Sequence, residues 1–177
     1  MNQGSVGALM LVETNPLYTL PNAPRFAEGL KKVKLSVAFS MRENETTAAS
    51  KYVLATPHFL ESWGDALIER GQYSLIQPTI HPLFDTRQFQ DSLLKWMGSE
   101  DNYYSFIKKN WAASILKGGS FNKVLQSGHF SITEELIPAT PKELDFNAIG
   151  AWLRQYKPGD LELTVYTKAG IGDGQQA

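Results

Sequence analysis

The chain has 177 residues, of which 42% are hydrophobic and 11% aromatic, which is enough for a globular domain with an apolar core. A balance of 17 Lys+Arg against 18 Asp+Glu gives a net charge of −1, which excludes a nonspecific binder of nucleic acid or anionic membrane. The absence of cysteine excludes disulfides, cysteine-ligated clusters and a thiol nucleophile in this chain.

The first half of the sequence alternates strand and helix patterns. Residues 6–13 form a near-continuous apolar run, which predicts a parallel strand covered on both faces. Asn22 can cap a helix that buries Phe26 and Leu30, and residues 35–39 read as a second strand. A shorter unit follows, with a helix at 45–50 and a strand at 51–55, and then another strand at 73–78. We expect a β-α-β crossover at the start of the chain.

From residue 85 onward the pattern becomes helical. A capping box of Asp85 and Gln88 predicts a helix that stops at Gly98, and Ser99 is predicted to cap the next helix. Further helices are expected from Ser120 to Gly128 and over residues 146–156, with a final strand at 161–165, where apolar and polar residues alternate.

These elements predict an α/β fold: a Rossmann-like, mostly parallel sheet flanked by helices, with a helical C-terminal extension. Residues 1–84 would form the Rossmann-like layer, and residues 85–177 the extension with a possible returning strand. Because a strand begins close to the first residue and the end is glycine-rich, we expect one domain of a longer polypeptide. No apolar stretch reaches the ~20 residues that cross a bilayer, so we expect no direct membrane insertion.

The segment Thr14-Asn15-Pro16 directly follows the first predicted strand. Pro16 restricts Asn15 to extended backbone, so the Asn15 amide would be held rigidly where ligands bind in open α/β sheets. The alternative is that Asn15 bonds its own loop in an Asx-turn. The loop contains no GxGxxG motif, which argues against a nicotinamide or flavin dinucleotide in the usual pose.

No residue pattern predicts catalysis or metal binding. Carboxylates such as Glu61 and Asp65 show no pairing for acid–base work. His58, His81 and His129 lack the spacing of metal ligands, and their roles are left open. We therefore predict no catalytic residue and no metal ligand in this chain.

Taken together, two stretches resemble the molybdopterin (dimethyl sulfoxide reductase-type) oxidoreductases: TNPLYTLPNAPRFAEGLKKVKLSVAFSMRENETTAASKYVLATPHFLESWGD and QPTIHPLFDTRQFQDSLLKWMG. The resemblance implies that Asn15 and the turn of Glu45, Thr46 and Thr47 flank a guanine dinucleotide at the strand ends. It also implies bis-molybdopterin guanine dinucleotide and iron–sulfur clusters in or beside the full-length chain, and no cofactor within this fragment. Family members usually carry Ala-Asp before the third strand, where this chain has Ser50-Lys51.

Within that family the chain is similar to the molybdopterin-oxidoreductase-like half of the large iron–sulfur subunit of alternative complex III, a quinol:cytochrome c oxidoreductase of Bacteroidetes. The similarity is carried by residues 102–111, 121–128 and 172–177. It implies a periplasmic location at the inner membrane, and as partners the other domains of the same polypeptide and the membrane subunits of a respiratory complex.

Two functional hypotheses follow. The first is a structural domain with a vestigial cofactor pocket in a respiratory quinol:electron-acceptor oxidoreductase, part of an enzyme but not itself catalytic. The alternative is the guanine-dinucleotide-binding domain of an active molybdopterin oxidoreductase. A stand-alone hydrolase or transferase has no nucleophile or metal set in this sequence.

Overall fold

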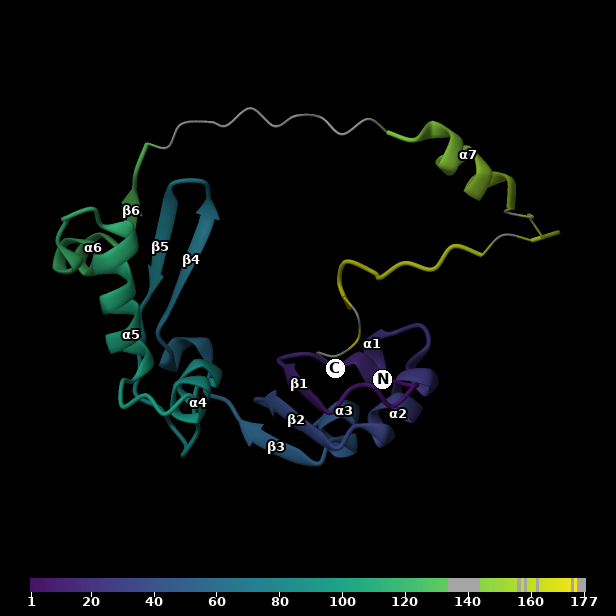
Figure 1. Cartoon of the computed structure of the whole chain (residues 1–177), viewed down its shortest axis with the longest axis horizontal. Coiled ribbons are helices and arrows are strands. Elements are labelled where there is room, and N and C mark those ends of the chain that lie inside the picture. The colour runs from purple at the N-terminus through teal and green to yellow at the C-terminus, as the bar shows by residue number, and fades with distance from the viewer. Residues whose placement is uncertain (134–143, 156, 158, 162, 173, 175–177) are drawn as a thin grey trace. The chain divides into compact units, whose positions relative to one another are not determined.

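A computed structural model of the chain describes residues 1–133, 144–155, 157, 159–161, 163–172 and 174 (Figure 1). The chain divides into two compact units, Met1–Glu134 and Glu135–Ala177. The first unit contains two separate three-stranded sheets and all the candidate site residues.

The N-terminal sheet is parallel and has the strand order β1-β2-β3 (Figure 1). Its strands are β1 (Ala8–Val12), β2 (Leu35–Ser40) and β3 (Tyr52–Ala55). Helices α1 (Pro16–Thr19) and α2 (Ala23–Lys32) connect β1 to β2, and α3 (Glu45–Ala49) connects β2 to β3. The predicted β-α-β unit and the α/β fold class are therefore confirmed. The four-residue helix α1 was not predicted, since its sequence reads as a proline-flanked loop.

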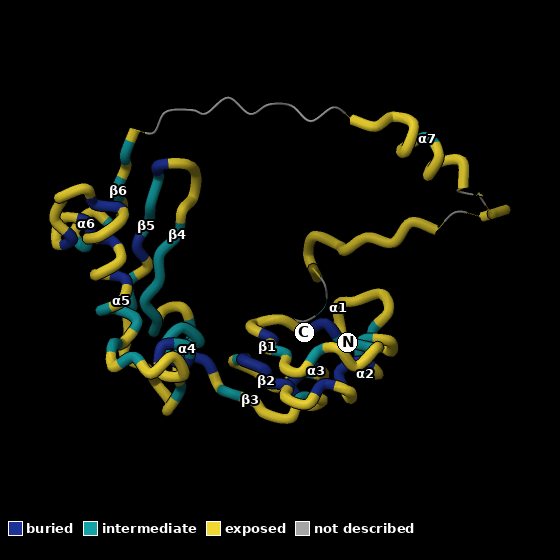
Figure 2. The backbone as a smooth tube through the Cα atoms, viewed as in Figure 1, coloured by how far each residue is buried: buried dark blue, intermediate teal, exposed yellow. Residues whose placement is uncertain are grey.

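Helix α2 covers one face of this sheet. Leu30 is 2% exposed and packs with Leu11 and Ala38, and Phe26 packs against the same cluster. The predicted apolar spacing of α2 is confirmed, and Figure 2 shows β2 buried along most of its length.

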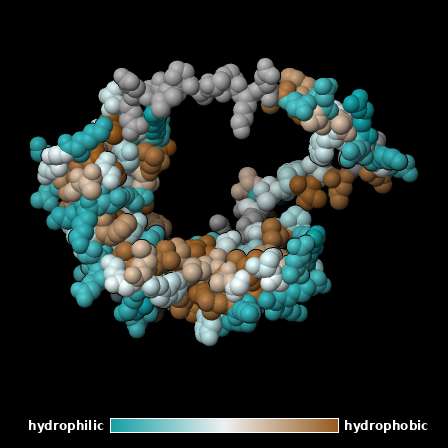
Figure 3. Space-filling view, viewed as in Figure 1, coloured by the Kyte–Doolittle hydropathy of each residue, from teal (hydrophilic) through white to brown (hydrophobic). Residues whose placement is uncertain are grey.

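The prediction that the first strand is covered on both faces is wrong. Leu11 is buried, but Met10 and Val12 on the opposite face are 45% and 37% exposed. On that face Val37, paired with Met10, and Phe39, paired with Val12, are buried, and the Phe39 ring forms T-shaped pairs with Phe89 and Trp96. Apolar side chains consequently reach the surface over this sheet (Figure 3). A continuous apolar run indicates apolar side chains on both faces of a strand, but it does not show whether another element covers each face.

The second sheet is antiparallel and has the order β4-β5-β6. It follows a 3-10 turn, η1 (Phe59–Glu61), and consists of β4 (Gly64–Glu69), β5 (Gln72–Ile76) and β6 (His129–Ser131). Of these strands only β5 was predicted. The sheet joins residues on both sides of the predicted domain boundary at residue 84.

Three helices complete the first unit: α4 (Phe89–Trp96), α5 (Tyr103–Asn110) and α6 (Phe121–Ser127), with α5 continuing into a π-helical turn, η2 (Trp111–Ile115). Ile107, Trp111 and Val124 are at most 2% exposed and pack with Leu75 of β5. This second core cluster attaches α5, η2 and α6 to the antiparallel sheet. The predicted stops hold, because Gly98 and Gly128 both have positive φ, 77° and 75°.

Two predicted helix starts are wrong. Helix α4 begins after Gln88, not after Asp85, and the Gln88 side chain makes no capping bond. Its Nε2 instead donates to the Trp63 carbonyl oxygen at 2.6 Å. Helix α5 begins after Asn102, whose Oδ1 accepts from the Ser105 backbone N–H at 2.9 Å, and not after Ser99.

The second unit contains α7 (Phe146–Gln155). The helix predicted over residues 146–156 is thus present, although Tyr156 lies outside the described residues. Its apolar side chains are exposed (Figure 2), with Trp152 at 70%. The predicted final strand is not present in its described residues, 161 and 163–165. Within the described part of the chain, no helix combines the length and apolarity needed to span a bilayer.

Candidate functional site

Asn15 lies at the carboxyl end of β1, where the chain turns into α1. Its φ of −124° and ψ of 67° lie outside the extended region, so the extended backbone predicted from Pro16 is wrong. Asn15 is 7% exposed, and its carbonyl oxygen accepts from the backbone N–H groups of Tyr18 and Thr19. Its side chain makes no capping bond to α1. The alternative prediction, that the Asn15 side chain bonds its own loop in an Asx-turn, is therefore wrong.

The Asn15 carboxamide instead joins the β1–α1 loop to the start of α3. Its Nδ2 donates to Glu45 Oε2 at 2.7 Å. Its Oδ1 accepts from Thr46 Oγ1 at 2.7 Å and from the Thr46 backbone N–H at 3.3 Å. Both ends of the amide are thus bonded to α3.

Thr46 completes this polar network and is fully buried, with 0% exposure. Its Oγ1 donates to Asn15 and accepts from the Leu17 backbone N–H at 3.1 Å. A single hydroxyl therefore connects the first residues of α3 with those of α1. We call Asn15, Glu45 and Thr46 the Asn15 network.

Thr47, the fourth predicted residue, serves a different purpose. It forms a capping box with Asn44: Asn44 Oδ1 accepts from the Thr47 N–H at 2.9 Å, and Thr47 Oγ1 accepts from the Asn44 N–H at 2.8 Å. Thr47 also lines a cavity of about 250 Å³ together with Glu43, Ala48 and Val53. The structure therefore brings three of the four predicted residues into one network and places the fourth beside it.

The charge in the Asn15 network is the carboxylate of Glu45. Donation from Asn15 lowers the pKa of Glu45, and the backbone N–H of Glu45 itself lowers it further, whereas burial opposes both effects. A carboxylate in the first turn also suits the positive end of a helix. The Asn15 amide is thus held by a group that stays ionised at neutral pH.

A second strand-end contact was not predicted from the sequence. Thr56, which follows β3, donates from its hydroxyl to Glu13, which follows β1. Glu13 has a φ of 47°, an unusual backbone conformation for a residue with a side chain. The hydrogen bond reaches past the end of β2, because the Thr56 N–H bonds to Ser40 and the Glu13 N–H to Phe39. An isolated glutamate after an apolar run gave no signal of this contact.

The rings of His58 and His129 contact residues close to them in sequence. His58 Nδ1 accepts from the Leu60 N–H at 3.3 Å in the η1 turn, and the His129 ring contacts the Ser127 carbonyl oxygen at 3.1 Å. His81 is exposed. Among the described residues, no group of three or more His, Asp or Glu side chains could hold a metal ion.

Lys51, the departure from the Ala-Asp pair that the family resemblance predicts, turns away from the Asn15 network. Its Nζ donates to the Lys34 carbonyl oxygen at 2.8 Å, beside the start of β2. The lysine therefore lies at the amino ends of the strands, opposite the edge where Asn15 lies.

This geometry defines the class of the protein: an α/β domain with a parallel sheet and a polar loop–helix junction at its strand ends. No protein-family profile matches the chain. The chain is 30% identical over 131 residues to a curated protein, the "menaquinone reductase, molybdopterin-binding-like subunit" of Nitratidesulfovibrio vulgaris. The alignment covers 70% of this chain and 19% of that protein.

Among solved structures, acetylene hydratase from Pelobacter acetylenicus is similar, with a TM-score of 0.55 and 18% identity, over 71% of this chain and 18% of that one. The chain thus spans about a fifth of the length of both proteins. The structural match confirms the α/β fold, and the curated relative confirms the resemblance to molybdopterin oxidoreductases. The finer similarity to alternative complex III stays a prediction, as does the role of the four site residues in cofactor binding.

Proposed function

We propose that this chain is a structural, non-catalytic domain of a respiratory quinol:electron-acceptor oxidoreductase. In this proposal the strand ends that would bind a dinucleotide in related enzymes instead hold α1 and α3 together. The observation that supports this proposal is the Asn15 network. In an open site the Asn15 amide would face a ligand. Here its nitrogen and its oxygen both bond to α3, and Asn15 is 7% exposed.

The residues as arranged do not fit a pterin or guanine dinucleotide. A phosphate or guanine edge that took the place of Glu45 or Thr46 on the Asn15 amide would break these hydrogen bonds, and Thr46 has no exposed surface. No buried side-chain nitrogen or oxygen in the described residues lacks a hydrogen-bond partner, whereas a preformed polar site leaves groups open for its ligand. The Glu45 carboxylate would also repel a phosphate.

The proposed partners are the other domains of the same polypeptide and the membrane subunits of a respiratory complex. The support is that the curated relative is named as a subunit of menaquinone reductase, and as molybdopterin-binding-like. We propose a location on the periplasmic side of the inner membrane, and this part rests on the sequence resemblance to alternative complex III alone.

Calorimetric titration with guanosine diphosphate tests the proposal. We expect no saturable heat from the wild-type chain, since both polar atoms of the Asn15 amide already have partners in α3. Asn22→Ala is the matched control, because Asn22 precedes α2 as Asn15 precedes α1 and its side chain caps nothing.

Saturable micromolar binding by the wild-type chain would overturn the proposal. If that binding were lost in Asn15→Ala and retained in Asn22→Ala, it would establish the alternative function, a guanine-dinucleotide-binding domain of an active molybdopterin oxidoreductase.

A further inference from the structure

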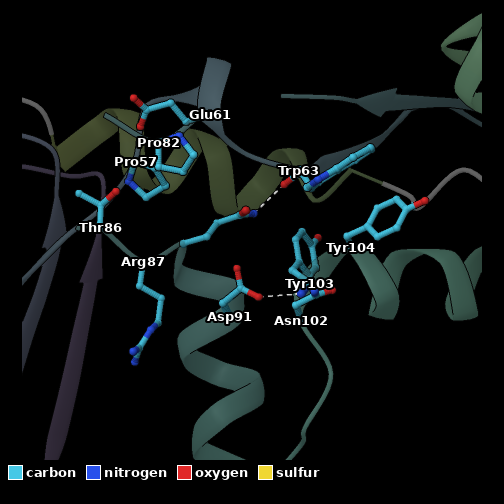
Figure 4. A pocket seen from close by; sticks show the side chains of 11 residues that line it. Pro57, Glu61, Trp63, Pro82, Thr86, Arg87, Asp91, Asn102, Tyr103 and Tyr104 are labelled. Carbon is cyan, nitrogen blue, oxygen red and sulfur yellow. Dashed lines mark hydrogen bonds between the residues drawn. The ribbon is translucent and has the colours of Figure 1, made fainter. Parts of the chain in front are cut away.

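A larger cavity lies away from the Asn15 network, between the segment that follows β3 and helices α4 and α5. Its volume is about 460 Å³, within the range of small-molecule sites. Figure 4 shows Pro57 and Pro82 on one side of it, and Trp63, Tyr103 and Tyr104 on the other.

The three aromatic side chains form one wall, which we call the aromatic wall. The rings of Trp63 and Tyr104 lie 4.4 Å apart between centroids and are tilted by 43°. Tyr103 is the first residue of α5 and stands next to them in the lining. The faces of such rings carry partial negative charge and attract cations.

Asp91 of α4 supplies a full negative charge to the same cavity. Its Oδ1 accepts from the Tyr103 backbone N–H at 2.6 Å, while its Oδ2 has no partner within the part of the chain that the structure describes. The other acidic residue in the lining is Glu61. Both of its carboxylate oxygens have partners, because they accept from the backbone N–H groups of His58 and Leu83. Asp91 thus holds the carboxylate oxygen that remains open.

This charge is not neutralised from within the cavity. Arg87 is exposed and also belongs to the lining, but its side chain leads away from Asp91 (Figure 4). No ion pair joins the two among the described residues. Burial raises the pKa of Tyr103, and the carboxylates of Asp65 and Asp91 raise it further, as expected where negative charge surrounds a phenol.

We propose that this cavity binds an alkylammonium or guanidinium group, held by Asp91 Oδ2 and by the faces of the aromatic wall. Such a group is available from a lysine or arginine side chain of a partner protein, or from a free amine. The site shares no residue with the Asn15 network and does not depend on the proposed function.

A nuclear magnetic resonance titration of the isotope-labelled chain tests this inference. The probes are N-acetyl-arginine amide, N-acetyl-lysine amide and n-butylammonium, with N-acetyl-norleucine amide as the neutral analogue of the same shape. The reporter is the backbone N–H of Tyr103, because it donates to Asp91 directly. We expect the cations to saturate with dissociation constants on the order of 1 mM, and the neutral analogue not to saturate.

Asp91→Asn should weaken binding of the cations roughly tenfold, since it removes the charge and leaves a carbonyl oxygen to accept from Tyr103. Glu100→Gln, a nearby exposed acid outside the lining, is the matched control and should bind like the wild type. Tighter binding of the capped amino acids than of n-butylammonium supports a protein side chain as the source, and equal binding supports a free amine.

Three results would overturn the inference: no saturable shift with any cation, equal binding of the neutral analogue, or unchanged affinity in Asp91→Asn. The guanosine diphosphate titration uses a different ligand and a different part of the fold. Either proposal can therefore fail while the other stands.

Discussion

At the scale of single residues, the side-chain amide of Asn15 determines what the carboxyl end of β1 contacts. The family resemblance placed Asn15 beside Glu45 and Thr46, and hydrogen bonds join the three in the structure, whereas the extended Asn15 backbone predicted from Pro16 is not found. The sequence could not predict that the amide turns toward α3, since Asn-Pro is equally compatible with a ligand, a turn or a helix partner. Nor could it predict the Glu13–Thr56 contact, which depends on the register of three strands.

Replacing Asn15 by alanine tests this arrangement. Asn15→Ala leaves the hydroxyl of Thr46 buried without its acceptor, and an unsatisfied buried group costs about 1–3 kcal/mol. We expect the free energy of unfolding, measured in urea, to fall by that amount. Asn22→Ala should change it by no more than about 0.5 kcal/mol, because the exposed Asn22 makes no side-chain capping bond. Equal losses in the two variants would contradict the structural role of the network.

At the scale of elements, the sequence predicted those whose signals are local. The β-α-β unit combines an apolar run, a helical period and a second apolar run within residues 6–39, and all three are present. β4 and β6 were missed because they are strands through pairing with β5, not through their own patterns. The start of α4 was misplaced for a related reason, as a distant carbonyl, that of Trp63, engages Gln88.

The end of α6 is an element boundary that the sequence predicted and a substitution can test. Gly128 has a φ of 75°, while the space where a side chain would lie is open. Gly128→Ala should therefore lower the free energy of unfolding by about 1 kcal/mol through backbone strain alone. Gly7→Ala is the control, because that site is equally open and its φ is not in the left-handed range; a change within about 0.5 kcal/mol is expected there. Similar thermal unfolding midpoints for both variants would argue against strain at Gly128.

At the scale of the whole molecule, the first unit is built around two buried clusters. One contains Leu11, Leu30 and Ala38, and the other joins Leu75 of β5 to Ile107 and Trp111. The second cluster and the β5–β6 pairing both connect residues on either side of position 84. Spacing and composition could not show this, because a strand and the helices that bury it need not be neighbours in sequence.

Two fragments measure where the folding unit ends. Fragment 1–134 keeps every residue of both buried clusters, so we expect it to unfold in urea in one cooperative transition. Fragment 1–84 keeps Leu75 but loses Ile107, Trp111 and the other partners that bury it, and its antiparallel sheet loses β6. The slope of the unfolding free energy against urea concentration scales with the surface that unfolding exposes. For fragment 1–84 this slope should therefore be smaller than its length alone would predict. A steep transition from fragment 1–84 would instead support the boundary after residue 84, with the parallel sheet as a domain that folds alone.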